Sequence, residues 1–272
     1  MGNPLGAEQL QRYRNEGVVF PVPAVDFDRS ELALGRALEF LDCLGPEAHA
    51  VDSSQLHLFL PWAFDLAVEP DVLDAVESVL GENLVVWATT VFAKPPGTTA
   101  KITWHQDATY WGLDSTQVTT AWIALSSSNP GNGCMRVEPG TQELPIQPHH
   151  DTFAADNLLS RGQEIQVEVD ENAVVDVVLE PGEMSLHHVN LVHGSNPNSS
   201  DGWRVGFVVR YVTPEVRQVG QIPRGVLARG RDDFGHFEWV DRPDERPLAE
   251  AVAALREFNR DFLTALMSSN DE

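Results

Sequence analysis

The sequence feature that most constrains the fold is a long series of short strand-like segments that begins near residue 83. Each segment is rich in β-branched and aromatic residues, and clusters of Gly, Pro, Asn and Ser separate most of them. The segments span residues 84–93, 102–107, 117–125, 163–169, 174–179, 184–193 and 203–212. Many strands at irregular spacing, after a helical beginning, are typical of a jelly roll or a related barrel of two sheets. We therefore expect a mainly β core.

Helical patterns flank this β-rich region on both sides. Residues 7–16 read as a short polar helix, and residues 30–44 and 71–80 place apolar side chains on one helical face. Residues 248–267 return to helical spacing, after a stretch rich in Gly, Pro and Arg that reads as a long ordered loop. The flanking α-helices are expected to pack outside the sheets.

The length of 272 residues fits one domain with a large core. We expect a single domain over residues 1–272. Its parts are a helical preface at about residues 7–80, a barrel core at about 83–213 and a C-terminal loop and helix at 214–267.

Charge and cysteine content limit the partners. The chain has 41 acidic residues against 18 Lys and Arg, which gives a net charge of -23. Nucleic acids and anionic membranes bind clustered positive charge, so we expect neither as a partner and expect a small-molecule substrate instead. Two cysteines are too few for a disulfide framework, and no secretory signal is visible, so we expect a cytoplasmic protein. The oligomeric state is left open.

One candidate metal-binding motif is the His105-Gln106-Asp107 segment. Alternate residues of a strand project to the same face, so His105 and Asp107 are expected to point together. Two His and one carboxylate on one side of an Fe(II) ion leave three positions open, which suits a chelating 2-oxo acid and O2. The motif alone is weak, because many strands carry a surface His and Asp.

A second segment supplies three candidates for the third ligand. His187, His188 and His193 lie on an apolar stretch that follows a turn at residues 180–183. In a regular strand His187 and His193 share one face and His188 occupies the other. The alternative for each is a core histidine that bonds the backbone.

Two arginines lie on an otherwise apolar segment. Arg204 and Arg210 share one face of the expected strand, about 20 Å apart along it, so both cannot bind one carboxylate. A guanidinium buried without a partner is costly, and binding a carboxylate through two parallel hydrogen bonds would explain it. A salt bridge to an acidic residue of the chain is the alternative.

In combination these motifs resemble the phytanoyl-CoA dioxygenase family of Fe(II)- and 2-oxoglutarate-dependent oxygenases, which includes ectoine hydroxylase. The matching segments are residues 105–107, 122–125, 132–135 with 139–140, 193–195 and Arg204, and the resemblance extends from about residue 10 to residue 211. It implies a double-stranded β-helix core, which is jelly-roll and cupin-like. It also implies an iron ion bound by His105, Asp107 and His193.

The resemblance further implies 2-oxoglutarate and O2 as cosubstrates. It implies that Arg204 pairs with the distal carboxylate of 2-oxoglutarate, and that Ser195, Trp122 and Lys94 line the same site. Halogenases of this superfamily have a small residue in place of the ligand carboxylate. Because Asp107 is present, we expect a hydroxylase that releases succinate and CO2, or a related oxidation, and not a halogenase.

The substrate site is predicted from four residues. Tyr110 and Trp111 follow the first motif directly, and Gln55 and His57 lie in a polar break before an apolar segment. The net charge disfavours a CoA thioester, so we expect a small polar metabolite such as an amino acid or another zwitterion. The alternatives are an oxygenase acting on an acyl-CoA or carrier-bound substrate, a cupin-like metal hydrolase or isomerase, and a non-catalytic binding protein.

Overall fold

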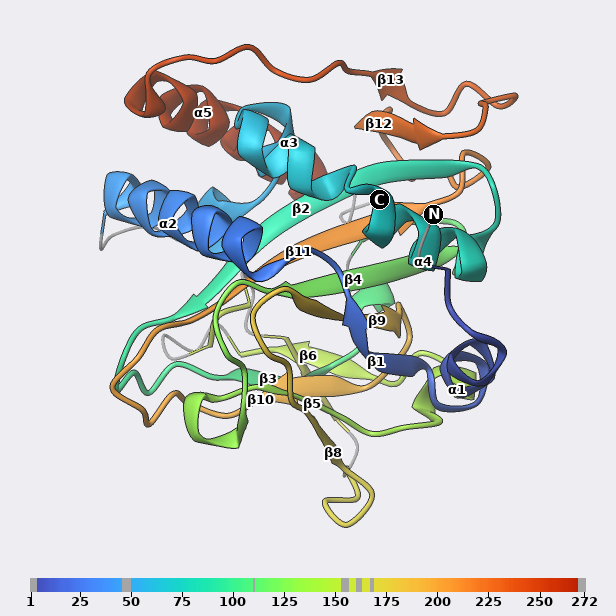
Figure 1. The fold of residues 1–272 in the computed structure, drawn as a ribbon. Coiled ribbons are helices and arrows are strands. Elements are labelled where there is room, and N and C mark those ends of the chain that lie inside the picture. The colour runs from blue at the N-terminus through green and yellow to red at the C-terminus, as the bar shows by residue number, and fades with distance from the viewer. Residues whose placement is uncertain are drawn as a thin grey trace.

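The computed structural model describes residues 4–45, 50–109, 111–152, 157–159, 163–166 and 169–268. In this part of the chain the core consists of two facing β-sheets (Figure 1). The larger sheet contains, in spatial order, β1 (Val18–Pro23), β9 (Glu183–His188), β4 (Val118–Ala124), β11 (Arg204–Val212), β2 (Leu84–Lys94), β12 (Arg224–Arg229) and β13 (Glu238–Trp239). The smaller sheet contains β3 (Ile102–His105), β10 (His193–Ser195), β5 (Met135–Val137) and β8 (Val175–Val177). A separate pair is formed by β6 (His149–Asp151) and β7 (Gln163–Ile165).

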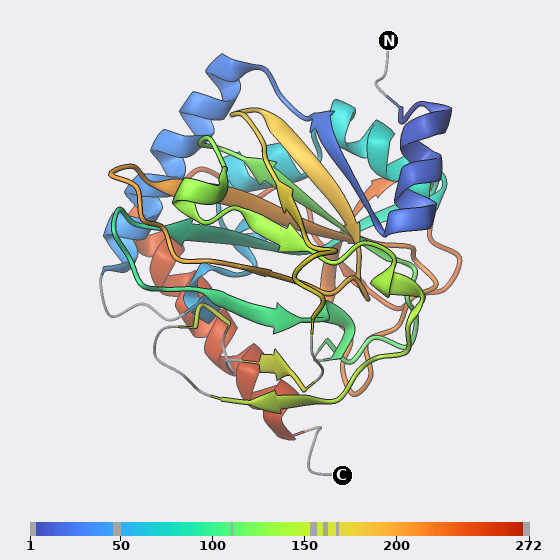
Figure 2. The ribbon, with the colours of Figure 1, turned by 90° about the horizontal axis from the view of Figure 1, so that it is seen from below.

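Helices cover the outer face of the larger sheet. The helices are α1 (Ala7–Glu16), α2 (Phe27–Leu44), α3 (Pro61–Ala67), α4 (Pro70–Leu80) and α5 (Leu248–Ser268). Figure 1 shows α2, α3 and α5 on one side of this sheet and the smaller sheet on the other, and Figure 2 gives the view turned by 90°. Four of these helices coincide closely with the predicted segments 7–16, 30–44, 71–80 and 248–267. The predicted mainly β jelly-roll core with flanking helices is confirmed.

Side chains of β11 point alternately to the helix-covered outer face of the larger sheet and to the inner face, which is directed at the smaller sheet. Val205, Phe207 and Val209 pack outward in the same cluster as buried helix residues, whereas Val208 packs inward with residues of β5 and β8. Arg204 and Arg210 have the same parity as Val208 and therefore lie on the inner face. The space between the two sheets thus receives both arginines of β11.

The segment expected to be one strand over residues 184–193 is in fact two strands. β9 ends at His188 in the larger sheet, and after a short turn β10 begins at His193 in the smaller sheet. A parity argument along a single strand therefore does not apply to His187 and His193. The chain crosses from one sheet to the other between them.

Two further expectations differ from the structure. The preface at 7–80 contains a strand, β1, which pairs antiparallel with β9. The stretch read as a loop contains β12, whose Val226 and Leu227 pair with β2 and extend the larger sheet. The Gly and Pro residues around β12 obscured an apolar pattern of only a few residues. No helix in the described part of the chain combines the length and hydropathy that a membrane span requires.

Candidate metal centre

His105 and Asp107 are brought together by the end of a strand and the turn that follows it. β3 ends at His105, and Asp107 begins a 3-10 turn, so the two residues are not alternate positions of one strand as the sequence suggested. The turn still places the His105 Nε2 3.5 Å from the Asp107 Oδ1. Gln106 points away and bonds the backbone carbonyl of Asn190 through its Nε2 at 2.8 Å.

His193 joins these two residues from the neighbouring strand. His193 and His105 are directly paired in the antiparallel register of β10 and β3, and their ring centroids are 4.2 Å apart. One ligand atom from each of His105, Asp107 and His193 lies within 4.8 Å of the others, so these three residues could hold a metal ion. Below, they are called the triad.

Backbone contacts fix the orientation of both imidazoles. The Nδ1 of His105 lies 2.9 Å from the carbonyl oxygen of Thr103, and the Nδ1 of His193 lies 2.9 Å from that of Leu191. A carbonyl can only accept, so Nδ1 carries the proton in each neutral ring and Nε2 keeps its lone pair. This arrangement is common for metal-binding histidines, because the second hydrogen bond fixes the tautomer and the ring orientation.

The charges around the triad favour its metal-binding protonation state. Burial lowers the pKa of His193 to about 4, with a further contribution from His105, so this ring is neutral at pH 7. Burial alone would raise the pKa of Asp107. The hydrogen bond with His105 and the charges of His193 and Arg210 outweigh this effect, and the pKa of Asp107 lies below its usual value. A neutral His193 imidazole and an ionised Asp107 carboxylate are therefore available together.

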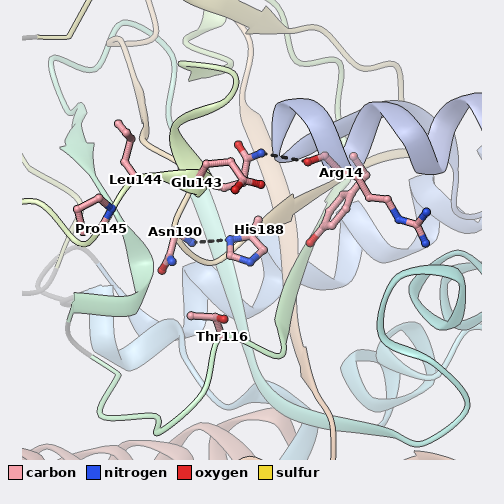
Figure 3. A pocket seen from close by; sticks show the side chains of 9 residues that line it. Arg14, Thr116, Glu143, Leu144, Pro145, His188 and Asn190 are labelled. Carbon is pink, nitrogen blue, oxygen red and sulfur yellow. Dashed lines mark hydrogen bonds between the residues drawn. The ribbon is translucent and has the colours of Figure 1, made fainter.

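His187 and His188 occupy different surroundings. The His187 Nε2 is 3.9 Å from the Asp107 Oδ2, and its ring centroid is 5.0 Å from that of His193, so His187 lies beside the triad. Burial lowers the pKa of His187 to about 3. His188 lines a separate groove of about 700 Å³ between α1 and the segment at residues 142–145, where it accepts a hydrogen bond from the Asn190 backbone (Figure 3).

A pair of buried cations lies between the sheets beyond the triad. Lys94 and Arg204 face each other across β2 and β11, and both side chains are fully or almost fully buried. Lys94 Nζ donates to Ser195 Oγ at 2.6 Å and to the carbonyl of Asn196. Arg204 donates to the carbonyl of Gly133 at 2.9 Å, while its Nε has no partner. In the part of the chain that the structure describes, neither cation forms an ion pair with a carboxylate.

The cost of burying Lys94 and Arg204 as charged groups is reflected in their lowered pKa values. Burial and the neighbouring Arg204 lower the pKa of Lys94 to about 6. Burial lowers the pKa of Arg204 to about 10. Charging both side chains without a nearby acid is unfavourable in the free protein, so Lys94 is mostly neutral there, and an anionic ligand would restore its charge and pair with Arg204.

Trp122 completes this part of the site because Gly206 makes room for it. Trp122 lies on β4 beside β11, and a Cβ at Gly206 would overlap its indole ring. The ring therefore lies across Gly206, with the guanidinium carbon of Arg204 5.4 Å from its centroid. The structure thus brings four predicted cosubstrate residues together: Lys94, Trp122, Ser195 and Arg204.

Arg210 lies on the inner face at the other end of β11. Its Nη1 donates to Thr90 Oγ1 at 2.8 Å, and its guanidinium carbon lies 4.9 Å from the ring centroid of Trp111. The charge of Asp107 acts on Arg210 and opposes the lowering of its pKa by burial. The salt bridge that was the alternative for Arg210 is not found with the described residues.

The predicted substrate residues that the structure describes, Gln55, His57 and Trp111, have different surroundings. Trp111 packs against Trp87 and beneath Arg210. Gln55 is buried, with its side-chain oxygen unpartnered, and its backbone bonds that of Thr89. His57 is fully buried and bonds Thr89 Oγ1 at 3.0 Å, and burial lowers its pKa to about 3. Tyr110 lies outside the described residues.

The position of Thr89 determines what His57 can contact. Thr89 alternates with Ala88 and Thr90 on β2, and Thr90 meets the inward-facing Arg210. Thr89 therefore faces the helices on the outer side of the larger sheet. His57 lies on that outer side, so the structure does not bring it to the triad.

Sequence reasoning missed one residue beside the metal-binding turn. His149, on β6, accepts the backbone N–H of Gln106 through Nε2 at 3.1 Å. Its Nδ1 lies 2.7 Å from the carbonyl oxygen of Gln147, which fixes the tautomer. This contact holds the turn between His105 and Asp107. No local pattern identified it, because 42 residues of sequence separate Gln106 and His149.

Comparisons with known sequences agree with this arrangement. The sequence model of the family described as Phytanoyl-CoA dioxygenase (PhyH) matches residues 44–206, which is more than half of the chain. The peroxisomal phytanoyl-CoA dioxygenase of Bos taurus is 35% identical over 141 residues, which are 50% of this chain and 41% of that protein. The chain thus spans less than half the length of this relative.

Comparisons with solved structures cover more of the chain. A structure described as the non-heme monooxygenase ThoJ in its apo form is 32% identical, covers 96% of this chain and 99% of the other, and has a TM-score of 0.82. Apo EctD from S. alaskensis has a TM-score of 0.64 at 19% identity, over 88% of this chain and 89% of the other, which shows the shared fold alone.

Proposed function

This chain belongs to the phytanoyl-CoA dioxygenase family, and from this premise we propose that it is an Fe(II)- and 2-oxoglutarate-dependent dioxygenase. One observation carries the proposal. A His-Asp-His cluster and an uncompensated pair of buried cations are joined by a single strand, β10, which carries both His193 and Ser195. A metal-chelating dicarboxylate would connect the two groups.

The triad fits Fe(II) by its donor set. Two imidazole nitrogens and one carboxylate form the facial arrangement typical of non-haem Fe(II) oxygenases. The free Nε2 lone pairs of His105 and His193 and the low pKa of Asp107 support binding without further proton loss. When bound, the iron would supply the oxidative chemistry with O2, which amino-acid side chains cannot perform.

The cation pair fits the distal carboxylate of 2-oxoglutarate. His193 and Ser195 are two residues apart, which is about 7 Å along a strand and the scale of a five-carbon dicarboxylate. Arg204 would bind the carboxylate through its guanidinium, while Lys94 and Ser195 add a charge and a hydroxyl. Trp122 would exclude water from one side of the bound chain.

The protein's own residues have three tasks in this proposal. The triad would hold the metal, and Arg204 and Lys94 would orient the cosubstrate. His149 keeps the Gln106 turn in place, so that Asp107 stays directed at the metal. Trp111 lies beside Arg210 near the triad and is retained as a proposed substrate contact, together with Tyr110 and Gln55.

The proposed reaction is hydroxylation of a small polar metabolite, with release of succinate and CO2. The net charge of -23 argues against a CoA ester, although the bovine relative is named for one. An oxygenase acting on an acyl-CoA or carrier-bound substrate is the second candidate. A hydrolase or isomerase would leave the buried Lys94 and Arg204 without a ligand to explain them.

Two measurements test the proposal. Anaerobic addition of Fe(II) and then 2-oxoglutarate to the protein should produce a weak visible charge-transfer band. A screen of metabolites for substrate-stimulated succinate release should then identify the substrate class. If 2-oxoglutarate changes neither the spectrum nor the affinity for metal, the proposed function is wrong.

Product analysis is expected to show oxygen addition, or loss of two hydrogens, and no chlorine. With Asp107 as a ligand, the protein, 2-oxoglutarate and O2 together account for six coordination positions, which leaves none for chloride. Mass spectrometry of products formed in concentrated chloride checks this. A chlorine isotope pattern from the unaltered protein would show that Asp107 is not a ligand.

Binding of 2-oxoglutarate is expected to take up a proton at Lys94. The pKa of Lys94 in the free protein is about 6, so the amine is mostly neutral at about pH 8, and a bound carboxylate raises this pKa again. Uptake of about one proton is expected at about pH 8 and little at about pH 5, where Lys94 is already charged.

Calorimetry of the metal-loaded protein in buffers with different ionisation heats measures this uptake. Lys94→Met should abolish it. The chain's other lysine, Lys101, is exposed, so Lys101→Met is the matched control and should retain it. Equal uptake in the wild type and Lys94→Met would exclude Lys94 as the source.

A further inference from the structure

Arg210 is the single residue of β11 that is not buried. β11 lies inside the larger sheet, between β4 and β2. The outer face around Arg210 is closed, because Val209 and Tyr211 are fully buried against the helices. The accessible part of Arg210 therefore belongs to the inner face, on the side of the triad.

The guanidinium of Arg210 is fixed in place but not neutralised. Thr90 and the ring of Trp111 hold it from two sides, and its Nε has no partner. Among the described basic residues, His105 and His187 contact the Asp107 carboxylate directly, and Arg210 acts on it from a greater distance. An oriented guanidinium that has a buried, unpartnered Nε and no carboxylate partner among the described residues is suited to binding an anion.

The residues next to Arg210 also present unused hydrogen-bonding groups. Across the sheet Arg210 pairs with Thr120, which in turn pairs with His187. The hydroxyl of Thr120 and the Nδ1 of His187 are buried and have no hydrogen-bond partner. The three side chains form one row on the inner face, and this row reaches Asp107 through His187.

Arg204 and Lys94 cannot serve the same group as Arg210. Six residues separate Arg204 from Arg210, which is about 20 Å along β11. In the proposed function, which this inference takes as its basis, the cosubstrate occupies the Arg204 end. Two carboxylates could then reach the Arg210 end, the metal-binding carboxylate of the cosubstrate and a carboxylate of the substrate, and the test below separates them by filling the first position with N-oxalylglycine.

We propose that Arg210 binds a carboxylate of the substrate and thereby determines specificity for acidic or zwitterionic metabolites. The carboxylate accepts hydrogen bonds from the guanidinium, and the Thr120 hydroxyl is placed to add another. A substrate acid close to Asp107 and to bound 2-oxoglutarate would otherwise be repelled by their negative charges. Arg210 offsets this repulsion and fixes which end of the substrate lies near the metal.

The test uses trifluoroacetate as a carboxylate probe and trifluoroacetamide as its neutral match, followed by fluorine NMR. The full chain is loaded with Zn(II) and N-oxalylglycine, an unreactive analogue that occupies the metal and the Arg204 end. Four proteins are compared: the wild type, Arg210→Gln, Arg210→Lys and Arg231→Gln. Arg231 is a surface arginine paired with Asp233, so its variant controls for loss of one positive charge. Zinc content is measured for each protein.

The wild type and Arg231→Gln are expected to bind trifluoroacetate and not trifluoroacetamide. Arg210→Gln should weaken trifluoroacetate binding by more than about tenfold at unchanged zinc content. Arg210→Lys should retain part of it, and this variant decides the matter if Arg210→Gln does not fold.

Three results would overturn the inference. The first is absence of trifluoroacetate binding to the wild type, and the second is equal binding to the wild type and Arg210→Gln. If Arg210→Gln does not fold, equal binding to the wild type and Arg210→Lys takes the place of the second result. The third is loss of zinc from Arg210→Gln. The last would make Arg210 a positioning residue for Asp107. Failure of N-oxalylglycine to bind the zinc-loaded wild type would instead reject the proposed function, so the two failures are distinguishable.

Discussion

Replacing His105, Asp107 or His193 by Ala is expected to remove bound iron and to abolish succinate formation while the chain stays folded. Each residue supplies one of three donor atoms that lie within 4.8 Å of one another. Loss of a residue that only supports a ligand already costs about 10–100-fold in metal affinity, so loss of a ligand should cost more. Metal content after desalting and succinate formation measure the effect, and circular dichroism tests the fold.

His188→Ala is the matched control for this experiment. His188 follows His187 directly, but it lines the groove next to α1 and bonds the Asn190 backbone (Figure 3). Its variant should bind iron as the wild type does. Normal iron content in His193→Ala together with loss in His188→Ala would move the third ligand to His188 and contradict the proposed triad.

Arg204→Ala is expected to raise the KM for 2-oxoglutarate by about 30-fold or more. Removing one partner of a buried charge pair costs about 2–5 kcal/mol, and about 1.4 kcal/mol corresponds to a factor of ten. Arg204 is almost fully buried and lies beside Trp122, so water cannot easily replace its guanidinium. Arg204→Lys restores the charge without the planar fork and should recover only part of the affinity.

Arg210→Ala provides the comparison for Arg204→Ala. The two arginines share a strand and a face but lie about 20 Å apart along it. Steady-state kinetics should therefore show a much smaller effect of Arg210→Ala on the KM for 2-oxoglutarate. Equal effects of the two variants would contradict the assignment of the cosubstrate to the Arg204 end.

The sequence predicted the site better than the path of the chain through it. His105 and His193 were identified because their motifs are local, although the strand that was expected to carry His187 to His193 crosses between sheets. The parity argument for His105 and Asp107 assumed a straight strand, whereas Asp107 lies in a turn. Both residues still meet, because only Gln106 separates them and the contacts of Gln106 hold this part of the chain.

Other features depended on contacts between distant segments. His149 and Arg210 lie on two strands, β6 and β11, that come close to the triad only in the folded chain. His57 was expected at the substrate because it is polar in an apolar setting. Its hydrogen-bond partner, Thr89, points toward the helices. The sequence does not show which side chains of β2 point toward the helices and which point toward the smaller sheet.

The position of β3 has a consequence for how the protein keeps its metal. β3 is a four-residue strand at the end of the smaller sheet, and it supplies His105 and leads into Asp107, while its neighbour β10 supplies His193. Terminal strands of a sheet are prone to local unfolding, which exposes their amides to hydrogen exchange and their backbone to proteases. A bound metal would link the two strands through side chains and resist that opening, in addition to its part in the reaction. Iron limitation would then shorten the lifetime of the protein in addition to stopping its reaction. Without bound metal, β3 would lose the link to β10 that opposes its local unfolding.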